Sequence, residues 1–379
     1  MTTGAASPNG DVTSAAQRIP AMEAVSISRD FSLGRRQTLR AVRDVSLSLY
    51  RGTVVALVGE SGSGKSTVAR LLAGQEALTS GSIKLHGQPV SLSSRRAFRQ
   101  HKTEVQLVFQ DPFASLNPAH TVRYHLQRPV RLHQGKHSRD EVGHKVTTLL
   151  DQVRLVPAGH FAGKYPHELS GGQRQRVSFA RALAAEPSVL LADEPVSMLD
   201  VSIRLEMLGL LDDLRRRFQL ALLYITHDIA SARYFADEVL VMYAGQIVER
   251  GPAEELTQRP AHPYTQLLIA SAPDPDNLGS ILRRSSPPGA AGPPEAAGPP
   301  GAVGPGAVGP QDGRGPLGSG PAAAGCPFSP RCPLADDRCR QENPALAPVA
   351  TGRAAACWRL ETAAPWLAEP PLPRQGGGE

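Results

Sequence analysis

Cysteine is scarce in this sequence, and long hydrophobic runs are absent. Four Cys in 379 residues are too few for a disulfide-stapled secreted protein. No apolar run approaches the ~18 residues that a membrane-spanning helix needs. Residues 1–20 have no apolar centre of the kind that a secretory signal carries. We therefore expect a cytosolic chain that does not itself cross a membrane.

Aromatic residues and lysine are also few. The aromatic share is 5%, only six of the 41 basic residues are Lys, and the formal net charge is +6. No basic run is interleaved with aromatic side chains, so we expect no dedicated nucleic-acid surface. The hydrophobic share of 41% is enough for a sizeable core, which excludes disorder along the full length.

Composition divides the chain into segments. Residues 1–20 are small and polar, which indicates a disordered tail. Residues 287–325 are rich in Pro, Gly and Ala without a sustained glycine period, which indicates a flexible linker and not collagen. A short segment with all four Cys follows at 326–361, and residues 362–379 form a second tail.

Residues 21–260 alternate short apolar runs with helical patterns, which is typical of an α/β fold with a mostly parallel sheet. Buried strands are predicted at 54–58, 105–109, 189–192 and 220–225. A helical insertion is predicted at about 111–169. An amphipathic helix before the last strand is indicated by apolar residues on one face, namely Ile203, Met207, Leu210, Leu211, Leu214 and Phe218.

A glycine-rich loop follows the first of these strands. Its sequence, Gly59-Glu60-Ser61-Gly62-Ser63-Gly64-Lys65-Ser66, matches the phosphate-loop pattern G-x-x-x-x-G-K-[ST], and Thr67 follows it. Backbone N–H groups in such a loop form an anion nest at the start of a helix. Lys65 can reach the β- and γ-phosphates, and the Ser66 hydroxyl can complete a Mg²⁺ shell. The pattern predicts a nucleoside-triphosphate site.

Two acids end a later strand. Asp193 and Glu194 follow the apolar run 189–192, so a rigid strand delivers them together. Asp193 can hold Mg²⁺ through water, and Glu194 can orient or deprotonate the attacking water. Upstream, Ser170-Gly171-Gly172-Gln173 has a Ser suited to cap a helix whose N-terminus can grip phosphate.

Three motifs in this order resemble those of an ATP-binding-cassette (ABC) ATPase over residues 21–260. They are the phosphate loop, the segment Leu-Ser-Gly-Gly-Gln and the segment Leu-Ala-Asp-Glu-Pro. The resemblance implies an α/β core with a mostly parallel sheet, an antiparallel β part and a helical insertion, and ATP with Mg²⁺ as cofactors. It implies roles for Gln110 as the lid glutamine, for Asp200 in the loop between two nucleotide sites, and for His227 as the switch histidine. Met198 stands where that loop usually has Ala. Phe31 is either an adenine-stacking residue or a core residue.

Two further segments resemble the oligopeptide/dipeptide importer subfamily. They are Phe109-Gln110-Asp111-Pro112 with its continuation to Pro118, and the His262-Pro263-Tyr264-Thr265 segment in the extension 261–286. This resemblance implies a peripheral ATPase on the cytoplasmic face of the cell membrane. Its partners would be two membrane permeases, a second ABC ATPase subunit and, indirectly, an extracytoplasmic solute-binding protein.

The four-Cys segment resembles the tail of the same subfamily. Cys326, Cys332, Cys339 and Cys357 are spaced more widely than the knuckles of structural zinc sites. The resemblance implies an iron–sulfur cluster, [4Fe–4S], and zinc or no metal are the alternatives.

Other functions remain possible for these motifs. Some importer relatives carry nickel or other small solutes. Non-transport ABC ATPases that act on nucleic acid or ribosomes have coiled-coil or zinc insertions, or two cassettes in one chain. Only 105 positions separate Lys65 from Ser170, without sustained heptads, and one cassette is present. These features favour an importer subunit.

Overall fold

A computed structural model describes residues 19–34, 38–92, 94–111, 115–135, 137–271 and 324–368. Most of the predicted tails and of the predicted linker lie outside the described residues, as do Pro112, Phe113 and Ala114. None of the helices within the described ranges has the length and apolar character to span a membrane.

An eight-stranded sheet forms the centre of the molecule, in the order β11-β12-β10-β9-β3-β8-β7-β6. Its strands from β9 to β6 run parallel, and β10, β12 and β11 add antiparallel pairs at one side. The four predicted strands are confirmed. They are β3 (Val54–Val58), β6 (Val105–Val108), β7 (Val189–Asp193) and β8 (Ala221–Thr226). The remaining strands are β9 (Glu238–Tyr243), β10 (Gln246–Pro252), β11 (Ala347–Ala350) and β12 (Arg353–Ala355).

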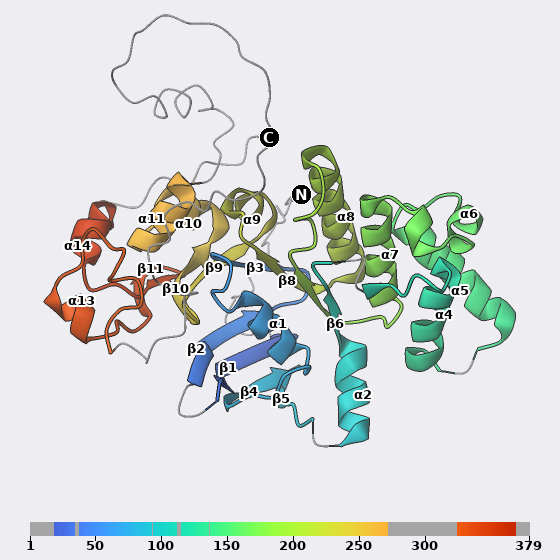
Figure 1. Cartoon of the computed structure of the whole chain (residues 1–379), viewed down its shortest axis with the longest axis horizontal. Coiled ribbons are helices and arrows are strands. Elements are labelled where there is room, and N and C mark those ends of the chain that lie inside the picture. Colours follow the sequence, from blue (N-terminus) through green and yellow to red (C-terminus); the bar gives the residue numbers. More distant parts are fainter. Residues whose placement is uncertain are drawn as a thin grey trace, which may run out of the picture.

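A separate antiparallel sheet has the order β2-β1-β4-β5. Its strands are β1 (Met22–Ser32), β2 (Thr38–Leu49), β4 (Ser80–Leu85) and β5 (Gln88–Pro89). Its buried side chains share one hydrophobic cluster with α1 (Lys65–Leu72) and with one face of the central sheet. Helix α1 therefore lies between two sheets (Figure 1) and buries Val68, Ala69, Leu71 and Leu72 in this cluster.

Helices form an arm at one end of the longest axis (green in Figure 1). The arm contains α4 (Val122–His133), α5 (Arg139–Gln152), α6 (Ala158–Ala162), the 3₁₀ turn η2 (Pro166–Glu168) and α7 (Gly171–Leu183). It is preceded by α2 (Arg95–Glu104) and followed by α8 (Val201–Phe218), α9 (Ile229–Phe235) and α10 (Ala253–Gln258). The apolar stripe predicted for α8 is buried at Met207, Leu210, Leu211 and Leu214.

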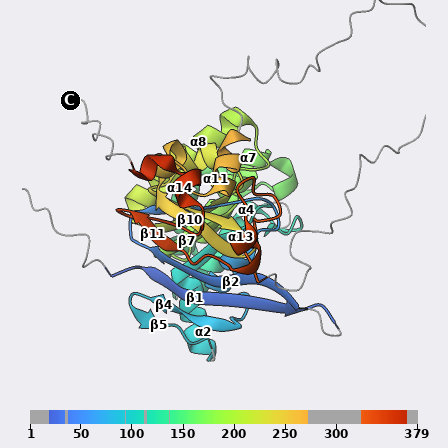
Figure 2. The same ribbon diagram turned by 90° about the vertical axis from the view of Figure 1, so that its left-hand side faces the viewer.

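The C-terminal segment packs on the other end of the molecule (Figure 2). It contains α13 (Asp337–Gln341), α14 (Leu360–Ala363) and η4 (Pro365–Ala368), and it lies beside α11 (Pro263–Ala270). Strand β12 pairs with β10, so this segment extends the central sheet. Arg353 donates to Glu249 at 3.1 Å, and their side chains are 3% and 1% exposed. The Glu249 carboxylate also accepts from the N–H groups of Ala261 and His262. Glu249 therefore joins β10, residues 261–262 and the distant β12.

Candidate nucleotide-binding and hydrolysis site

The phosphate loop connects β3 to α1, and two of its glycines are required by close packing. A Cβ on Gly59 would lie 2.2 Å from the carbonyl oxygen of Met242. Gly64 has φ of 106°, and a Cβ there would lie 2.3 Å from the carbonyl oxygen of Ala41. Neither position accepts a side chain, so the backbone is free to curl into an anion nest.

Lys65 begins α1 and is 5% exposed. Its Nζ donates to the carbonyl oxygens of Gly59 at 2.7 Å and Glu60 at 2.8 Å. Burial lowers the pKa of Lys65, and the nearby carboxylates of Glu194 and Asp193 oppose that effect. A buried cation folded over the loop fits the triphosphate of a nucleotide.

The loop opens into a cleft of about 880 Å³. Predicted site residues that line it are Phe31, Gln110, Glu194 and His227, with Glu60, Ser61, Gly62, Gly64, Lys65, Ser66 and Thr67 from the loop region. Side chains that the sequence did not single out also line it, among them Leu39, Arg40, Arg43 and Leu268. The volume lies in the range of small-ligand sites. The cleft is therefore large enough for a nucleotide.

Phe31 lies in this cleft, at the end of β1. The guanidinium of Arg29 sits 4.5 Å from the centre of its ring. One face of the ring is thus covered by a cation–π contact.

Ser66 and Asp193 place two oxygen donors side by side. The Ser66 hydroxyl donates to Asp193 Oδ1 at 3.1 Å. Burial raises the pKa of Asp193, and the neighbouring Glu194 carboxylate adds to this rise, while Ser66 opposes it. A pair of hard oxygen donors fits Mg²⁺, which keeps waters and phosphate oxygens as its other ligands.

Glu194 follows β7 with φ of 45°, an uncommon conformation for a residue with a side chain. Its N–H donates to the carbonyl oxygen of Ile225, which fixes this bend between two central strands. The carboxylate accepts from Gln110 Nε2 at 3.0 Å and lies 3.3 Å from His227 Nδ1. The structure thus brings the three predicted catalytic side chains together.

The segment from Ser170 to Gln173 does not line the cleft of the phosphate loop. It starts α7 with a capping box, in which the Ser170 hydroxyl accepts from the N–H of Gln173 and the Gln173 side chain accepts from the N–H of Ser170. Gly171, Gly172 and Asp200 do not line the cleft of the phosphate loop either. Asp200 precedes α8 as its N-cap residue. A single chain therefore does not assemble all the predicted nucleotide-binding residues in one place.

The four cysteines converge on one small pocket, together with His262 and Phe328. All four are free thiols. Burial raises the pKa of Cys326 and Cys339, and it raises the pKa of Cys357 to about 11. Within the described ranges, no group of three or more His, Cys, Asp or Glu side chains has a metal-holding arrangement. The thiols thus share a location without forming a preassembled metal site.

Two residues that sequence reasoning missed touch the phosphate loop from the C-terminal region. The Tyr264 hydroxyl accepts from the N–H of Glu60 at 2.9 Å. Arg331 donates to both carboxylate oxygens of Glu60, at 2.8 and 2.9 Å. The importer-like segment 262–265 and the four-Cys segment were the available signals, but neither pattern indicates a contact with the loop.

Comparisons with known proteins agree with this geometry. Residues 42–197 match the family model of the ABC transporter, and residues 248–301 and 308–339 match that of the oligopeptide/dipeptide transporter, C-terminal region. A probable peptide ABC transporter ATP-binding protein of Sinorhizobium fredii is 41% identical, over 84% of this chain and 82% of its own length. The chain belongs to the ATP-binding subunits of ABC transporters.

Other relatives and solved structures support this membership. The di/tripeptide transport ATP-binding protein DppF of Pseudomonas aeruginosa is 41% identical over 84% of this chain and 90% of its own length. The solved cbiO1 subunit of a Clostridium perfringens ABC transporter complex superposes with a TM-score of 0.57 at 28% identity, over 64% of this chain and 92% of its own. A dimeric ATP-binding cassette bound to ADP and Pi gives 0.56 at 26% identity, over 62% and 99%.

These findings confirm the predicted family and fold class. The protein is an ABC ATPase that binds ATP with Mg²⁺ and couples hydrolysis to transport. Among the similar solved structures, cbiO1 is part of an ABC transporter complex, and the ADP-bound cassette is a dimer.

Proposed function

We propose that this ABC ATPase powers the import of oligopeptides or dipeptides. It would act on the cytoplasmic face of the cell membrane, with two permeases and a second ATPase subunit, and indirectly with an extracytoplasmic solute-binding protein. The match of its C-terminal region to the oligopeptide/dipeptide transporter family carries this proposal. The named relatives support it, and an oligopeptide transport ATP-binding protein of Bacillus subtilis, AppF, is a further one, 38% identical over 84% of this chain and 89% of its own length.

The residues in the cleft support specific roles in hydrolysis. Lys65 and the loop N–H groups would bind the phosphates, and Ser66 and Asp193 would hold Mg²⁺, which neutralises phosphate charge when bound. Glu194 would accept a proton from the attacking water, because its carboxylate is oriented by Gln110 and lies beside His227. Gln110 and His227 would hold that carboxylate in place, and Phe31 would contact the base of the nucleotide.

A second subunit is needed to complete this site. Ser170, Gly171, Gly172 and Gln173 present the N-terminus of α7 away from the cleft, and Asp200 precedes α8 nearby. In a head-to-tail dimer, these groups of one subunit would close on ATP held by the other. The dimeric state of the solved ADP-bound cassette supports this arrangement.

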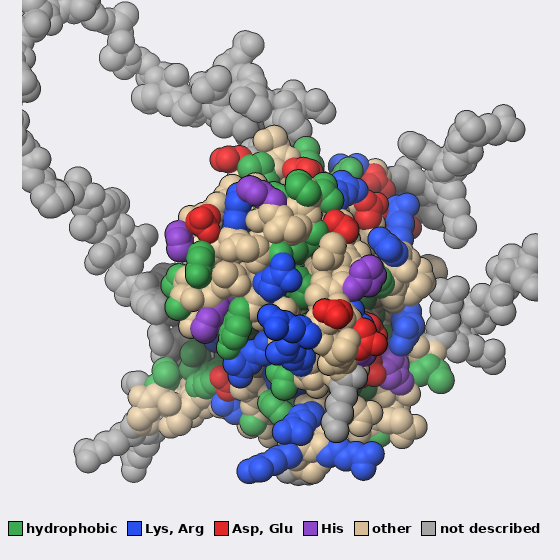
Figure 3. All heavy atoms as spheres, turned by 90° about the vertical axis from the view of Figure 1, so that its right-hand side faces the viewer, with side chains coloured by type: hydrophobic (Ala, Val, Ile, Leu, Met, Phe, Trp, Pro, Cys, Tyr) green, Lys and Arg blue, Asp and Glu red, His purple; other side chains and the backbone are tan. Residues whose placement is uncertain are grey.

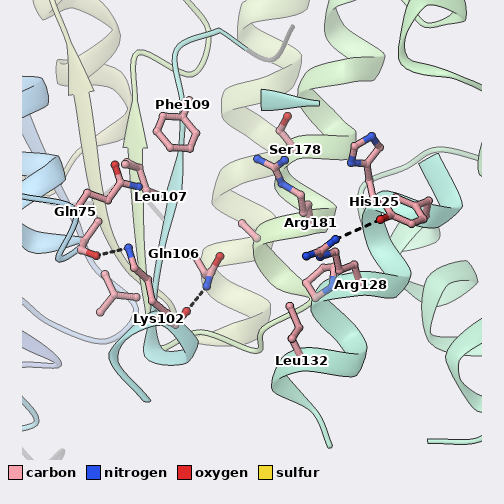
Figure 4. Close-up of a pocket in the computed structure, with 15 residues that line it drawn as sticks. Gln75, Lys102, Gln106, Leu107, Phe109, His125, Arg128, Leu132, Ser178 and Arg181 are labelled. Atoms are coloured by element: carbon pink, nitrogen blue, oxygen red, sulfur yellow. Dashed lines mark hydrogen bonds between the residues drawn. The ribbon is translucent and has the colours of Figure 1, made fainter. Parts of the chain in front are cut away.

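A second cleft fits contact with a permease. It has a volume of about 340 Å³ and lies between β6 and helices α4 and α7 (Figure 4). Its rim includes Leu132 and Phe109, which are 69% and 37% exposed. Phe109 precedes Gln110, whose side chain holds the Glu194 carboxylate. A permease that contacts Phe109 would therefore touch the residue directly before Gln110, whose side chain bonds the proposed base Glu194.

The face around this cleft is basic. Figure 3, which views the end of the molecule that carries the helical arm, shows Lys and Arg side chains gathered on that face. Exposed arginines on α2 and α4 contribute, namely Arg95, Arg96, Arg99, Arg123, Arg128 and Arg131. A permease loop with acidic and apolar side chains would complement this surface.

The substitution Leu132→Asp tests the permease contact. It is expected to reduce co-purification of the permeases and leave ATP binding by the isolated subunit unchanged. Tyr234→Asp is the matched control, because Tyr234 is 75% exposed and lies on α9, outside the cleft. Equal recovery of permeases with both variants would exclude this cleft as the contact.

The four thiols would hold a [4Fe–4S] cluster. Their convergence on one pocket supports this proposal, and a bound cation would offset the cost of ionising buried thiols. Anaerobically purified protein should then absorb visible light and contain iron. Zinc in its place, or protein without metal, would refute the cluster.

The identity of the transported solute can be tested with the isolated intact complex. With the solute-binding protein added, short peptides are expected to stimulate ATP hydrolysis, and nickel salts are not. Stimulation by nickel or another small solute, with no response to peptides, would overturn peptide import.

A further inference from the structure

Glu60, the second residue of the phosphate loop, is bonded to the C-terminal region through two of its polar groups. Its N–H donates to the Tyr264 hydroxyl, and its carboxylate accepts both bonds of a bidentate pair from Arg331. Its carbonyl oxygen accepts from Lys65 Nζ at 2.8 Å. The residue that bonds the candidate phosphate-binding lysine is thus also bonded to Arg331, which is 271 positions away in the sequence.

Arg331 is firmly anchored within the four-Cys segment. Phe328, three residues earlier, is 1% exposed and packs 5.3 Å from the ring of Tyr243 and 5.5 Å from that of Tyr264. The Arg331 guanidinium lies 5.9 Å and 5.7 Å from the rings of Tyr243 and Phe328. Since Cys326 and Cys332 flank this stretch and line the thiol pocket, Arg331 is held by the same turn as the thiols.

The pair also balances charge at the mouth of the nucleotide cleft. Glu60 lines this cleft, and its side chain is 33% exposed. An unpaired carboxylate there would repel an incoming triphosphate. A bidentate guanidinium cancels that charge and fixes the carboxylate geometry at the same time.

We propose that Arg331 is a positioning residue for ATP binding, which acts through Glu60 and makes the nucleotide affinity of the phosphate loop depend on the docked four-Cys segment. This inference rests on the proposed assignment of the phosphate loop as the ATP site. It adds a specific link from the C-terminal segment to that site.

The test uses the full-length chain and titration with the fluorescent nucleotide mant-ATP in the presence of Mg²⁺. Arg331→Gln is expected to raise the dissociation constant about fivefold, the size expected for one uncompensated charge near a triphosphate in a partly solvated site. Arg331→Lys should give an intermediate value, because an ammonium group does not make the two parallel bonds. High salt should shrink the difference from wild type.

Arg340→Gln is the matched control. Arg340 belongs to the same C-terminal segment and pairs with Asp337 at 2.8 Å, and its side chain is 60% exposed. This variant should bind mant-ATP like wild type. The double variant Glu60→Gln/Arg331→Gln should regain most of the lost affinity, since it removes the uncompensated charge. A purely structural role for Arg331 predicts no such rescue.

Hydrogen exchange gives a second measurement that does not depend on nucleotide. Amides of residues 59–66 should exchange faster in Arg331→Gln than in Arg340→Gln. Equal affinity and equal exchange in these two variants would overturn the inference, and so would a double variant as weak as the single one. If instead Lys65→Ala binds mant-ATP normally, the proposed ATP site itself fails, whereas the exchange comparison still tests the link from Arg331 to the loop.

Discussion

Nδ1 of His227 lies 3.3 Å from Oε2 of Glu194, at the end of two adjacent parallel strands. The Glu194 side chain is 15% exposed and that of His227 is 58% exposed, so the carboxylate is sheltered and the imidazole is its solvent-facing neighbour. Gln110 donates to the same oxygen. This arrangement favours Glu194 as the base. The exposed imidazole of His227 is placed to contact a ligand group that binds next to the Glu194 carboxylate.

Glu194→Gln is expected to reduce steady-state ATP hydrolysis by about 10²–10⁴-fold, the usual cost of losing a general base. ATP binding should be unchanged or tighter, because the amide keeps the shape and removes a negative charge. The variant should accumulate as an ATP-bound dimer with its cognate subunit in size-exclusion chromatography. Glu255→Gln, on α10, is the control. If Glu194→Gln retained hydrolysis within a few-fold of wild type, His227 would become the better candidate for the base.

Lys65→Ala is expected to abolish ATP binding. Loss of one partner of a buried charged contact costs about 2–5 kcal/mol, which corresponds to at least a 30-fold loss in affinity. Equilibrium titration with mant-ATP measures the effect. Lys84→Ala serves as control, since Lys84 lies on β4 and pairs with Glu23 outside the cleft. Near-normal affinity in a folded Lys65→Ala protein would contradict the role of this lysine.

Gly171→Asp is expected to stop hydrolysis while ATP binding survives. A carboxylate at the start of α7 would repel the γ-phosphate across the dimer interface. The fold should tolerate it, because a Cβ at Gly171 has only an ordinary contact, 3.5 Å from Leu199 Cδ2. Gly143→Asp, at an uncrowded position on α5, is the control. A monomer that hydrolyses ATP at full rate would disprove the shared site.

The buried His101 predicts a dependence of stability on pH. It is 2% exposed, its Nε2 bonds the carbonyl oxygen of Leu72, and burial lowers its pKa. Its neutral form is therefore favoured in the folded state, so its contribution to stability is complete above the unfolded pKa of about 6.5 and is lost as pH falls below it.

Urea unfolding at pH 7, 6 and 5 measures this contribution. His101→Gln should show a shallower fall in the free energy of unfolding over that range, by up to about 1.4 kcal/mol per pH unit. The amide of Gln can still donate to Leu72. Identical slopes for the variant and wild type would mean that His101 does not contribute to acid sensitivity.

Local patterns allowed much of the fold and of the site to be predicted. The central strands are runs of apolar residues, and β3, β7 and β8 are buried throughout, so their positions follow from composition alone. The phosphate loop is also a local pattern. Glycine is required at positions 59 and 64 because backbone carbonyl groups of other segments lie against them. Glu194 and His227 could be expected to meet, because their strands are parallel neighbours in this family of folds.

Contacts between remote segments could not be predicted in this way. The pair of Arg331 and Glu60 and the pair of Arg353 and Glu249 have no periodic or spacing signal, since each joins residues more than 100 positions apart. The left-handed bend at Glu194 has no signal in the sequence either, since its N–H bonds the carbonyl oxygen of Ile225 on a different strand. These features arise from tertiary packing.

The ion pair of Glu249 and Arg353 sets an order for events during synthesis. Arg353 is made 104 residues after Glu249, a delay of roughly 5–20 s at the usual rates of translation. Throughout that interval the nascent chain has the β10 carboxylate but not its guanidinium, and a buried charge without its partner is strongly destabilising. The emerging polypeptide therefore cannot complete this edge of its sheet until Arg353 has left the ribosome, so products that terminate before Arg353 should be recognised as unfinished by the proteases of the cell.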